Sequence, residues 1–213
     1  MNKIKGLISN NILLFFFSSI VLFFYILKPA QTASVLDIKK EDFVIGDNNA
    51  PITVIEYASL SCSHCAEFHI NTLPELIKEY VDKGKVKIVF RDFPFNYPAL
   101  LGSMVLRCVP KEVRFQYSKA LYQLQSKWVN RENAKTTQEL YKIMQSGGMK
   151  KEEFNNCIKN IDLENKILQG LMDAQNEFNI KSTPSFLING SLIEGNKPFK
   201  DFKQIIDKLL LEN

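Results

Sequence analysis

Two cysteines separated by two residues form the most distinctive chemical group in the sequence. Cys62 and Cys65 enclose Ser63 and His64 and follow a short apolar run that is typical of a strand. A C-x-x-C pair at a strand-to-helix junction indicates a redox-active dithiol. Backbone N–H groups at a helix start favour negative charge, so they would lower the pKa of Cys62 and make it a thiolate. Cys65 would lie one turn further in, where it could form a disulfide with Cys62.

His64 lies between the cysteines and could donate to the sulfur or add positive charge beside it. Two other interpretations of the motif remain open. One is a structural disulfide, and the other is a metal site of Cys62, Cys65 and His69, because Cys65 and His69 share a helix face. Closed zinc sites usually have four ligands, and this sequence has only two histidines and no second C-x-x-C. We therefore predict no metal, and we expect His69 to be a partly exposed residue without a chemical role.

Glu56 is the only charged residue inside the apolar run Ile52–Tyr57. Its neighbours favour burial, which would favour the protonated acid and allow it to relay a proton to a buried thiol. We expect such a carboxyl to have no cationic partner. The alternative is a carboxylate on an exposed side of the strand.

Cys108 and Cys157 are the two remaining cysteines. In an exported protein they suggest a second, structural disulfide. It would close a loop of about 50 residues and stabilise the fold by roughly 4 kcal/mol in the chain-entropy model. The alternative is a pair of buried, unbonded thiols.

The elements that position the motif follow from hydrophobic periodicity. Ile52–Tyr57 and Val86–Phe90 are predicted strands, and residues 63–82 between them have helical spacing, with a kink or restart at Pro74. A strand, a helix and a strand in this order predict two parallel strands. The preceding stretch, Ala33–Asn49, is polar and mixed, and we assign no strand or helix to it.

The rest of the chain is first helical and then returns to strands. Residues 98–179 contain segments rich in helix formers, namely Leu100–Cys108, Glu112–Gln125, Thr136–Gln145, Lys151–Lys159 and Leu163–Phe178. Asp162 is placed to cap the last of them. The closing elements are a strand at Ser185–Ile188, a turn at Asn189-Gly190, a strand at Leu192-Ile193 and a helix at Phe199–Leu211.

The first 33 residues read as an export segment. They carry three lysines and no acidic residue, and 12–27 is a short apolar run, as in a signal peptide. Cleavage after Ala33 would place Gln31 where a small residue is preferred, so an uncleaved anchor with membrane contact through 12–27 is the alternative. In both cases the remainder is exported. The formal net charge is +4, and without these lysines the chain is nearly neutral. It therefore lacks the basic surplus of a nucleic-acid-binding domain.

Taken together, the motifs resemble the thioredoxin superfamily, most closely its DsbA-like branch, over about residues 37–212. The resemblance is carried by ITVIEY, CSHC, VKIVFRDFPF, a helical block and STPSFLING, in this order. It implies an α/β thioredoxin fold for 34–213, with an all-helical domain, about 98–179, inserted between the second and third strands. It also implies that Glu56 matches the family's buried acid.

The resemblance further assigns roles around the motif. Cys62 would be the exposed nucleophile and Cys65 the buried resolving cysteine. Composition alone favours an ordinary trans bond before Pro184, but the resemblance implies a cis bond that faces the disulfide, with Thr183 and Pro184 binding substrate backbone. The best-known pattern of the family has proline where this chain has Ser63 and valine where it has Thr183, and both positions tune the redox potential.

The predicted function is that of a periplasmic thiol–disulfide oxidoreductase, anchored to the inner membrane if the N-terminal segment is not cleaved. It would introduce disulfides into exported cysteine-containing proteins through the Cys62–Cys65 pair, without metal or organic cofactor. The resemblance implies reoxidation by a quinone-linked, DsbB-like membrane partner. One alternative is a reductase or isomerase, but the sequence shows no dimerisation segment of the kind isomerases use, and we expect a monomer. A less favoured alternative is a metal carrier using Cys62, Cys65 and His69.

Overall fold

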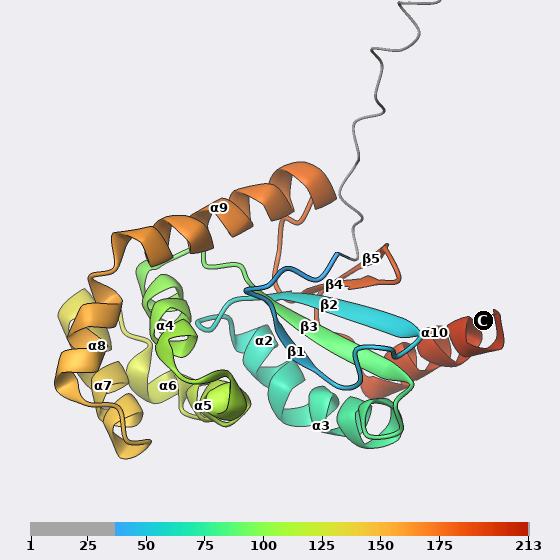
Figure 1. Ribbon diagram of the computed structural model, residues 1–213, viewed down its shortest axis with the longest axis horizontal. Helices are drawn as coiled ribbons and strands as arrows, with labels where there is room; N and C mark the ends of the chain where they lie inside the picture. The colour runs from blue at the N-terminus through green and yellow to red at the C-terminus, as the bar shows by residue number, and fades with distance from the viewer. Residues whose placement is uncertain (1–36, 213) are drawn as a thin grey trace, which may run out of the picture. The chain divides into compact units, whose positions relative to one another are not determined.

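The computed structural model describes residues 37–212 (Figure 1). The predicted signal peptide or anchor in residues 1–33, with its apolar run 12–27, lies outside the described residues. Among residues 37–212, no helix is both long and apolar enough to cross a membrane.

A mixed sheet of five strands forms the centre of the described domain, in the order β1-β3-β2-β4-β5. The strands are β1 (Phe43–Ile45), β2 (Ile52–Ala58), β3 (Val86–Asp92), β4 (Ser185–Ile188) and β5 (Ser191–Glu194). β2 and β3 are parallel, which confirms the prediction from the strand-helix-strand order, and β4 runs antiparallel to β2. Every residue of β2 is buried, as expected for an apolar run covered on both faces.

β1 corrects the sequence analysis, which assigned no element to residues 33–49. Its three residues pair antiparallel with β3, with Phe43 opposite Phe90 and Ile45 opposite Ile88. The Phe43 and Phe90 rings stack with centroids 5.3 Å apart. A strand this short is stabilised by the neighbour it pairs with, and a local sequence pattern does not reveal that neighbour.

The chain between β2 and β3 is helical but not a regular α-helix throughout. It consists of α2 (Ser63–Glu67), the π-helical turn η1 (Phe68–Thr72), α3 (Leu73–Leu76) and the π-helical turn η2 (Ile77–Val81). Pro74 lies in the first turn of α3, directly after the π-helical turn η1. The backbone at Thr72 stays in the right-handed helical region, so the helix changes its hydrogen-bond pattern beside Pro74 but does not end there. The predicted irregularity at Pro74 is thus present, without a new helix start.

The helical insertion lies between β3 and β4, which are the second and third strands of the prediction. Its helices are α4 (Tyr97–Cys108), α5 (Lys111–Gln123), α6 (Gln125–Trp128), α7 (Asn133–Ser146), α8 (Lys151–Ile158) and α9 (Ile161–Phe178), and α10 (Phe199–Glu212) closes the chain. Figure 1 shows α4 to α8 gathered to one side of the sheet, with α9 leading back towards β4. The prediction that Asp162 caps the last of these helices is wrong. Asn160 caps α9 by accepting from the N–H of Leu163, because the helix starts one residue earlier than Asp162.

The two faces of the sheet and the insertion have separate apolar cores. Phe68 of η1 and Phe202 of α10 pack on one face of the sheet, and Ala174 of α9 packs on the other. A third cluster fills the insertion and includes Leu60 and Cys65. The buried cysteine of the motif therefore packs in the core of the insertion rather than in that of the sheet.

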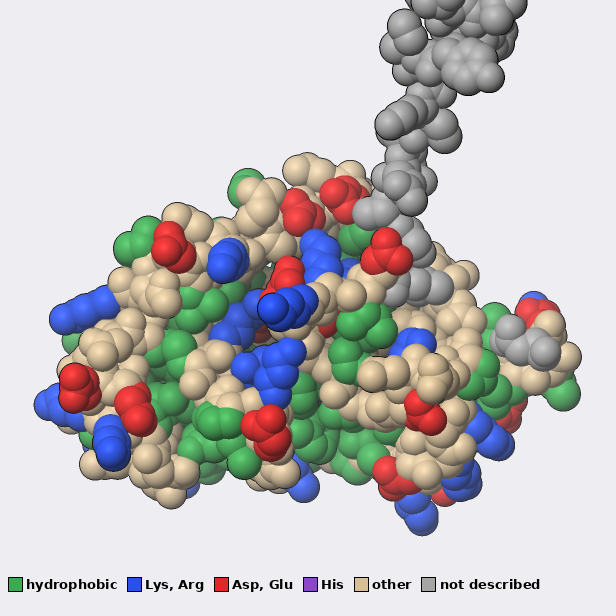
Figure 2. All heavy atoms as spheres, viewed as in Figure 1, with side chains coloured by type: hydrophobic (Ala, Val, Ile, Leu, Met, Phe, Trp, Pro, Cys, Tyr) green, Lys and Arg blue, Asp and Glu red, His purple; other side chains and the backbone are tan. Residues whose placement is uncertain are grey.

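Ion pairs join β3 to its surroundings. Arg91 lies 2.8 Å from the Asp42 carboxylate, and Arg107 of α4 lies 2.6 Å from that of Asp92. On the face seen in Figure 2, basic side chains (blue) and acidic side chains (red) lie close together near the middle of the domain. These arginines thus connect elements of the fold and are matched by acidic partners.

Candidate active site

Cys62 is the N-cap residue of α2, directly before its first residue, and its thiol is free and partly exposed. Its pKa is lowered from 9.0 to about 5, chiefly by the hydrogen bond with the Cys65 thiol. The Thr183 side chain and the backbone N–H groups of Cys65 and His64 act in the same direction, while burial opposes them. The sulfur is therefore a thiolate at neutral pH.

Thr183 faces Cys62 with two different groups. The Cys62 thiol lies 3.4 Å from the Thr183 carbonyl oxygen, to which it donates. In this dithiol form, the Thr183 hydroxyl oxygen is buried and has no hydrogen-bond partner among residues 37–212. Once the sulfur is ionised, that hydroxyl can donate to it, which explains why Thr183 favours the thiolate.

Cys65 has the opposite environment. Its side chain is fully buried, and burial is the main reason that its pKa is raised, helped by Cys62 and by the negative charge of Glu56. The N–H of Ser59 lies 3.5 Å from its sulfur. The motif therefore contains one thiolate that solvent can reach and one protected, neutral thiol.

The peptide bond between Thr183 and Pro184 is cis. The trans bond favoured by composition alone is wrong, and the cis bond agrees with the resemblance. Pro184 is buried where the chain enters β4, and its carbonyl accepts from the N–H of Gly195 at 2.8 Å. The role of both residues in substrate binding stays a prediction.

Glu56 and His69 form a buried pair that the sequence analysis did not predict. Glu56 is fully buried, and His69 Nε2 lies 3.1 and 3.0 Å from its two carboxylate oxygens. The His69 ring also stacks on Tyr122 of α5, with centroids 4.0 Å apart. The expectations of an exposed His69 and an unpartnered Glu56 are therefore wrong. The spacing of four residues between Cys65 and His69 was the available signal, since it directs both side chains inward.

The metal-site alternative finds no support in this geometry. His69 faces Glu56, and within residues 37–212 no three histidine, cysteine or acidic side chains gather as metal ligands would. His64 is 71% exposed, and its Nδ1 lies 3.5 Å from the Glu67 carboxylate one turn along the helix. The His64 ring was expected to donate to the Cys62 sulfur, but it is the backbone N–H of His64 that lowers the pKa of Cys62.

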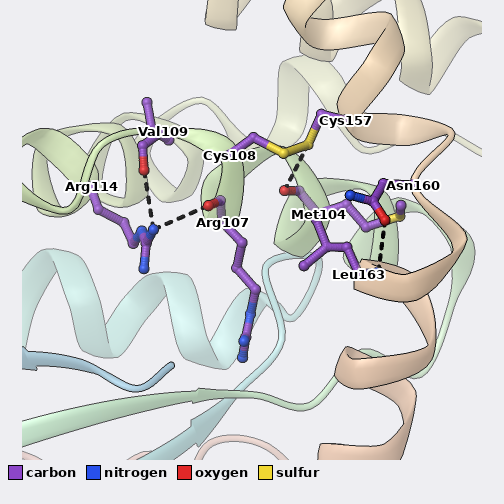
Figure 3. Close-up of a disulfide and its surroundings, with 8 residues drawn as sticks. All are labelled: Met104, Arg107, Cys108, Val109, Arg114, Cys157, Asn160 and Leu163. Atoms are coloured by element: carbon purple, nitrogen blue, oxygen red, sulfur yellow. Dashed lines mark hydrogen bonds between the residues drawn. A yellow bond between two sulfur atoms is a disulfide. The ribbon is translucent and has the colours of Figure 1, made fainter. Parts of the chain in front are cut away.

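Cys108 and Cys157 form a disulfide that joins α4 to α8 (Figure 3). Their Cα atoms are 6.2 Å apart, and the Cys157 sulfur lies 3.0 Å from the carbonyl oxygen of Met104. The alternative of two unbonded thiols is therefore wrong. Both residues belong to the insertion, so this bridge and the Cys62–Cys65 pair use separate cysteines.

Two residues that the sequence analysis did not consider hold the loop before the motif. The side-chain oxygen of Asn96 accepts from the hydroxyl of Ser61 at 3.0 Å. The side-chain amide of Gln125 donates to the carbonyl oxygens of Leu60 and Cys62, each at 2.9 Å. Both come from the insertion side of the chain, and no local pattern near the motif indicates them.

A sheet of this topology, with an unequal pair of thiols at the start of its first long helix, defines the class of thioredoxin-fold dithiol proteins. A family model described as thioredoxin matches residues 39–208. The chain belongs to the thioredoxin family, within its DsbA-like thiol–disulfide oxidoreductases.

Known proteins of this kind are similar over most of the chain. The crystal structure of Wolbachia pipientis alpha-DsbA1 is 34% identical and superposes with a TM-score of 0.75, covering 83% of this chain and 96% of that one. A putative protein-disulfide oxidoreductase of Rickettsia felis is 30% identical over 187 residues, which are 87% of this chain and 66% of that protein. Disulfide bond formation protein D of Bacillus subtilis is 26% identical, covering 78% of this chain and 76% of that protein. The chain thus spans about two thirds of the length of its rickettsial relatives.

Proposed function

We propose that the protein oxidises thiols of exported proteins by donating the Cys62–Cys65 disulfide to them. The observation that carries this proposal is the difference between the two sulfurs. Cys62 has a pKa of about 5, whereas burial raises the pKa of Cys65. Stabilising the reduced form as a thiolate makes the corresponding disulfide a stronger oxidant.

In the first step a substrate thiolate attacks the sulfur of Cys62. The Cys62–Cys65 bond breaks, a mixed disulfide forms at Cys62, and Cys65 leaves with the electron pair. Because the pKa of Cys65 is raised, its sulfur takes up a proton. Glu56 is fully buried and its charge acts on Cys65, so we assign it the exchange of that proton, with His69 holding its carboxyl group.

In the second step another substrate thiolate attacks the substrate's own sulfur in the mixed disulfide. The bond to Cys62 breaks, and Cys62 departs as a stable thiolate because its pKa is low. The substrate has then lost two electrons and gained a disulfide, while the protein holds a dithiol. Thr183, whose carbonyl oxygen lies 3.4 Å from the Cys62 sulfur, and Pro184, which follows it through the cis bond, are the residues we propose to bind substrate backbone.

The cycle requires an external oxidant and an oxidising compartment. We propose a quinone-linked, DsbB-like membrane protein as the acceptor of the two electrons. We assign the activity to the periplasm, with residues 1–33 as a cleaved signal or an inner-membrane anchor and residues 34–213 as the exported domain. Cell fractionation, with the mass of the mature N-terminus, tests this assignment, and a protein that stays in the cytoplasm would contradict it.

The redox potential of the Cys62–Cys65 pair tests the direction of the reaction. Equilibration with reduced and oxidised glutathione should give a potential well above that of thioredoxin, about −270 mV. The oxidised protein should also form disulfides in a reduced, unfolded model substrate. A potential near that of thioredoxin would instead favour a reductase or isomerase.

A further inference from the structure

The loop that carries Cys62 is held by an amide from the helical insertion. Gln125, the first residue of α6, donates from Nε2 to the carbonyl oxygens of Leu60 and Cys62, both at 2.9 Å. The partners are 65 and 63 residues away along the chain. These hydrogen bonds belong to no helix or sheet ladder, so the side chain of one residue joins the insertion to the nucleophile.

The two carbonyl groups affect the charge on the sulfur. The oxygen of Cys62 belongs to the nucleophile itself, and that of Leu60 lies two residues earlier. Carbonyl oxygens are the negative ends of peptide dipoles, so near a thiolate they oppose ionisation, whereas N–H groups favour it. The oxygen of Cys62 also accepts from the N–H of Ala66 at 3.1 Å, so Gln125 is a second donor to it, while the same amide holds the oxygen of Leu60. The positive N–H ends of the Gln125 amide offset the negative ends of these two dipoles beside the sulfur.

The position of the loop does not depend on Gln125 alone. Ser61 is hydrogen-bonded to Asn96, and Leu60 is packed tightly in the insertion core. A Cβ added at Gly102 of α4 would lie only 3.1 Å from the Leu60 side chain, which shows how closely the helix approaches. Loss of the Gln125 amide should therefore change the polarity around the loop and leave the fold in place.

We propose that Gln125 is a positioning residue for the redox reaction, which donates to the carbonyl groups of Leu60 and Cys62, offsets their negative ends and so favours the thiolate of Cys62. The proposal rests on the proposed function only in taking Cys62 as the reactive sulfur. It makes the oxidising strength of the motif depend on a side chain outside the thioredoxin elements.

Two near-isosteric variants test the proposal. Gln125→Met removes both donors, and Gln125→Glu replaces them with a carboxylate that faces two carbonyl oxygens. In reduced Gln125→Met, ultraviolet titration of the thiolate should give an ionisation constant for Cys62 about 3- to 10-fold smaller, the loss expected for about one net hydrogen bond. Gln125→Glu should show a larger decrease. In glutathione buffer, both variants should retain the Cys62–Cys65 disulfide under more reducing conditions than the wild type.

Gln123 supplies the matched control. It is exposed at the end of α5, two residues before Gln125, so Gln123→Met and Gln123→Glu make the same chemical changes without the two contacts. They should leave the titration and the glutathione equilibrium unchanged. Wild-type values in both Gln125 variants would overturn the inference and leave the proposed function intact. A wild-type protein that forms no Cys62–Cys65 disulfide would contradict the proposed function instead.

A measurement on the wild-type protein covers the case in which a variant fails to fold. In ¹⁵N-labelled protein, the side-chain amide signals of Gln125 should shift between the disulfide and dithiol forms, because their acceptors adjoin the reacting sulfur. The corresponding signals of Gln123 should not move. Gln125 signals that are identical in the two forms would overturn the inference.

Discussion

Removing the thiol of Cys65 should raise the pKa of Cys62. The hydrogen bond between the two sulfurs is the largest of the causes that lower the pKa of Cys62 to about 5. A hydrogen bond to a charged group contributes about 1.5–3 kcal/mol, and one pKa unit is worth ~1.4 kcal/mol. In Cys65→Ala the pKa of Cys62 should therefore rise to roughly 6–7, and nearer 6 because solvent screens the partly exposed sulfur.

The rate of alkylation at mildly acidic pH measures this change. At about pH 6 the wild-type Cys62 should be roughly nine-tenths thiolate, and in Cys65→Ala only about a tenth to a half. Iodoacetamide should then react with the variant about 2- to 10-fold more slowly at this pH, and at nearly the same rate at about pH 8 and above. Mass spectrometry of the reduced wild type should locate the label on Cys62, since Cys65 is buried.

Cys65→Ser provides the matched control, because its hydroxyl keeps a donor beside Cys62. Its pH profile should lie close to that of the wild type. A profile that is unchanged in both variants would show that the N–H groups at the start of α2 set the pKa, and that the sulfur–sulfur hydrogen bond does not. Preferential labelling of Cys65 in the reduced wild type would show that the two cysteines have been assigned the wrong way round.

Three further predictions concern stability and proton transfer. The pKa of Cys62 is about 5 in the folded dithiol and 9.0 in a free thiol. The free energy of unfolding of the reduced protein should therefore increase as pH rises from about 5 towards 9, and this gain is lost as pH falls through 5. Urea unfolding that is independent of pH in this range would contradict this prediction. Replacing Cys108 and Cys157 with alanine should cost at most about 4 kcal/mol of unfolding free energy and leave thiol exchange detectable; loss of exchange in a folded variant would give the bridge a catalytic role. Glu56→Gln should slow the pH-dependent reoxidation step and lower the free energy of unfolding, because His69 loses its carboxylate partner. In a double-mutant cycle with His69→Gln, the coupling energy should be about 0.5–3 kcal/mol. Additive effects of the two substitutions would show that the pair does not interact.

Elements with long apolar patterns could be predicted from the sequence, and those that depend on a neighbour could not. The buried strand β2 and the helix α9 follow from composition and periodicity, and only their ends differ from the prediction. β1 contains three residues, and its identity as a strand depends on β3, whose pairing the sequence does not display. The π-helical turns η1 and η2 likewise leave no sequence pattern that separates them from an α-helix.

The reactive pair was predictable because its chemistry is local. Cys62 and Cys65 are three residues apart at a strand-to-helix junction, so the first lies at the open end of the helix and the second lies one turn inside. The cis bond before Pro184 was not predictable from composition, which favours trans. It followed only from the resemblance of the whole chain, because the contact of Thr183 with Cys62 joins residues that are 121 positions apart.

The pairing of Glu56 with His69 follows from two physical requirements that the sequence already contains. A buried carboxyl group needs a hydrogen-bond partner, because an unsatisfied polar group in a protein interior is costly. The burial of Glu56 therefore implied a donor on a neighbouring element. The helix that follows the strand directs Cys65 inward, and His69 is one turn further along on the same face. The requirement for a partner and the helix geometry thus lead to the same residue, and the pair becomes predictable only when Glu56 and His69 are considered together.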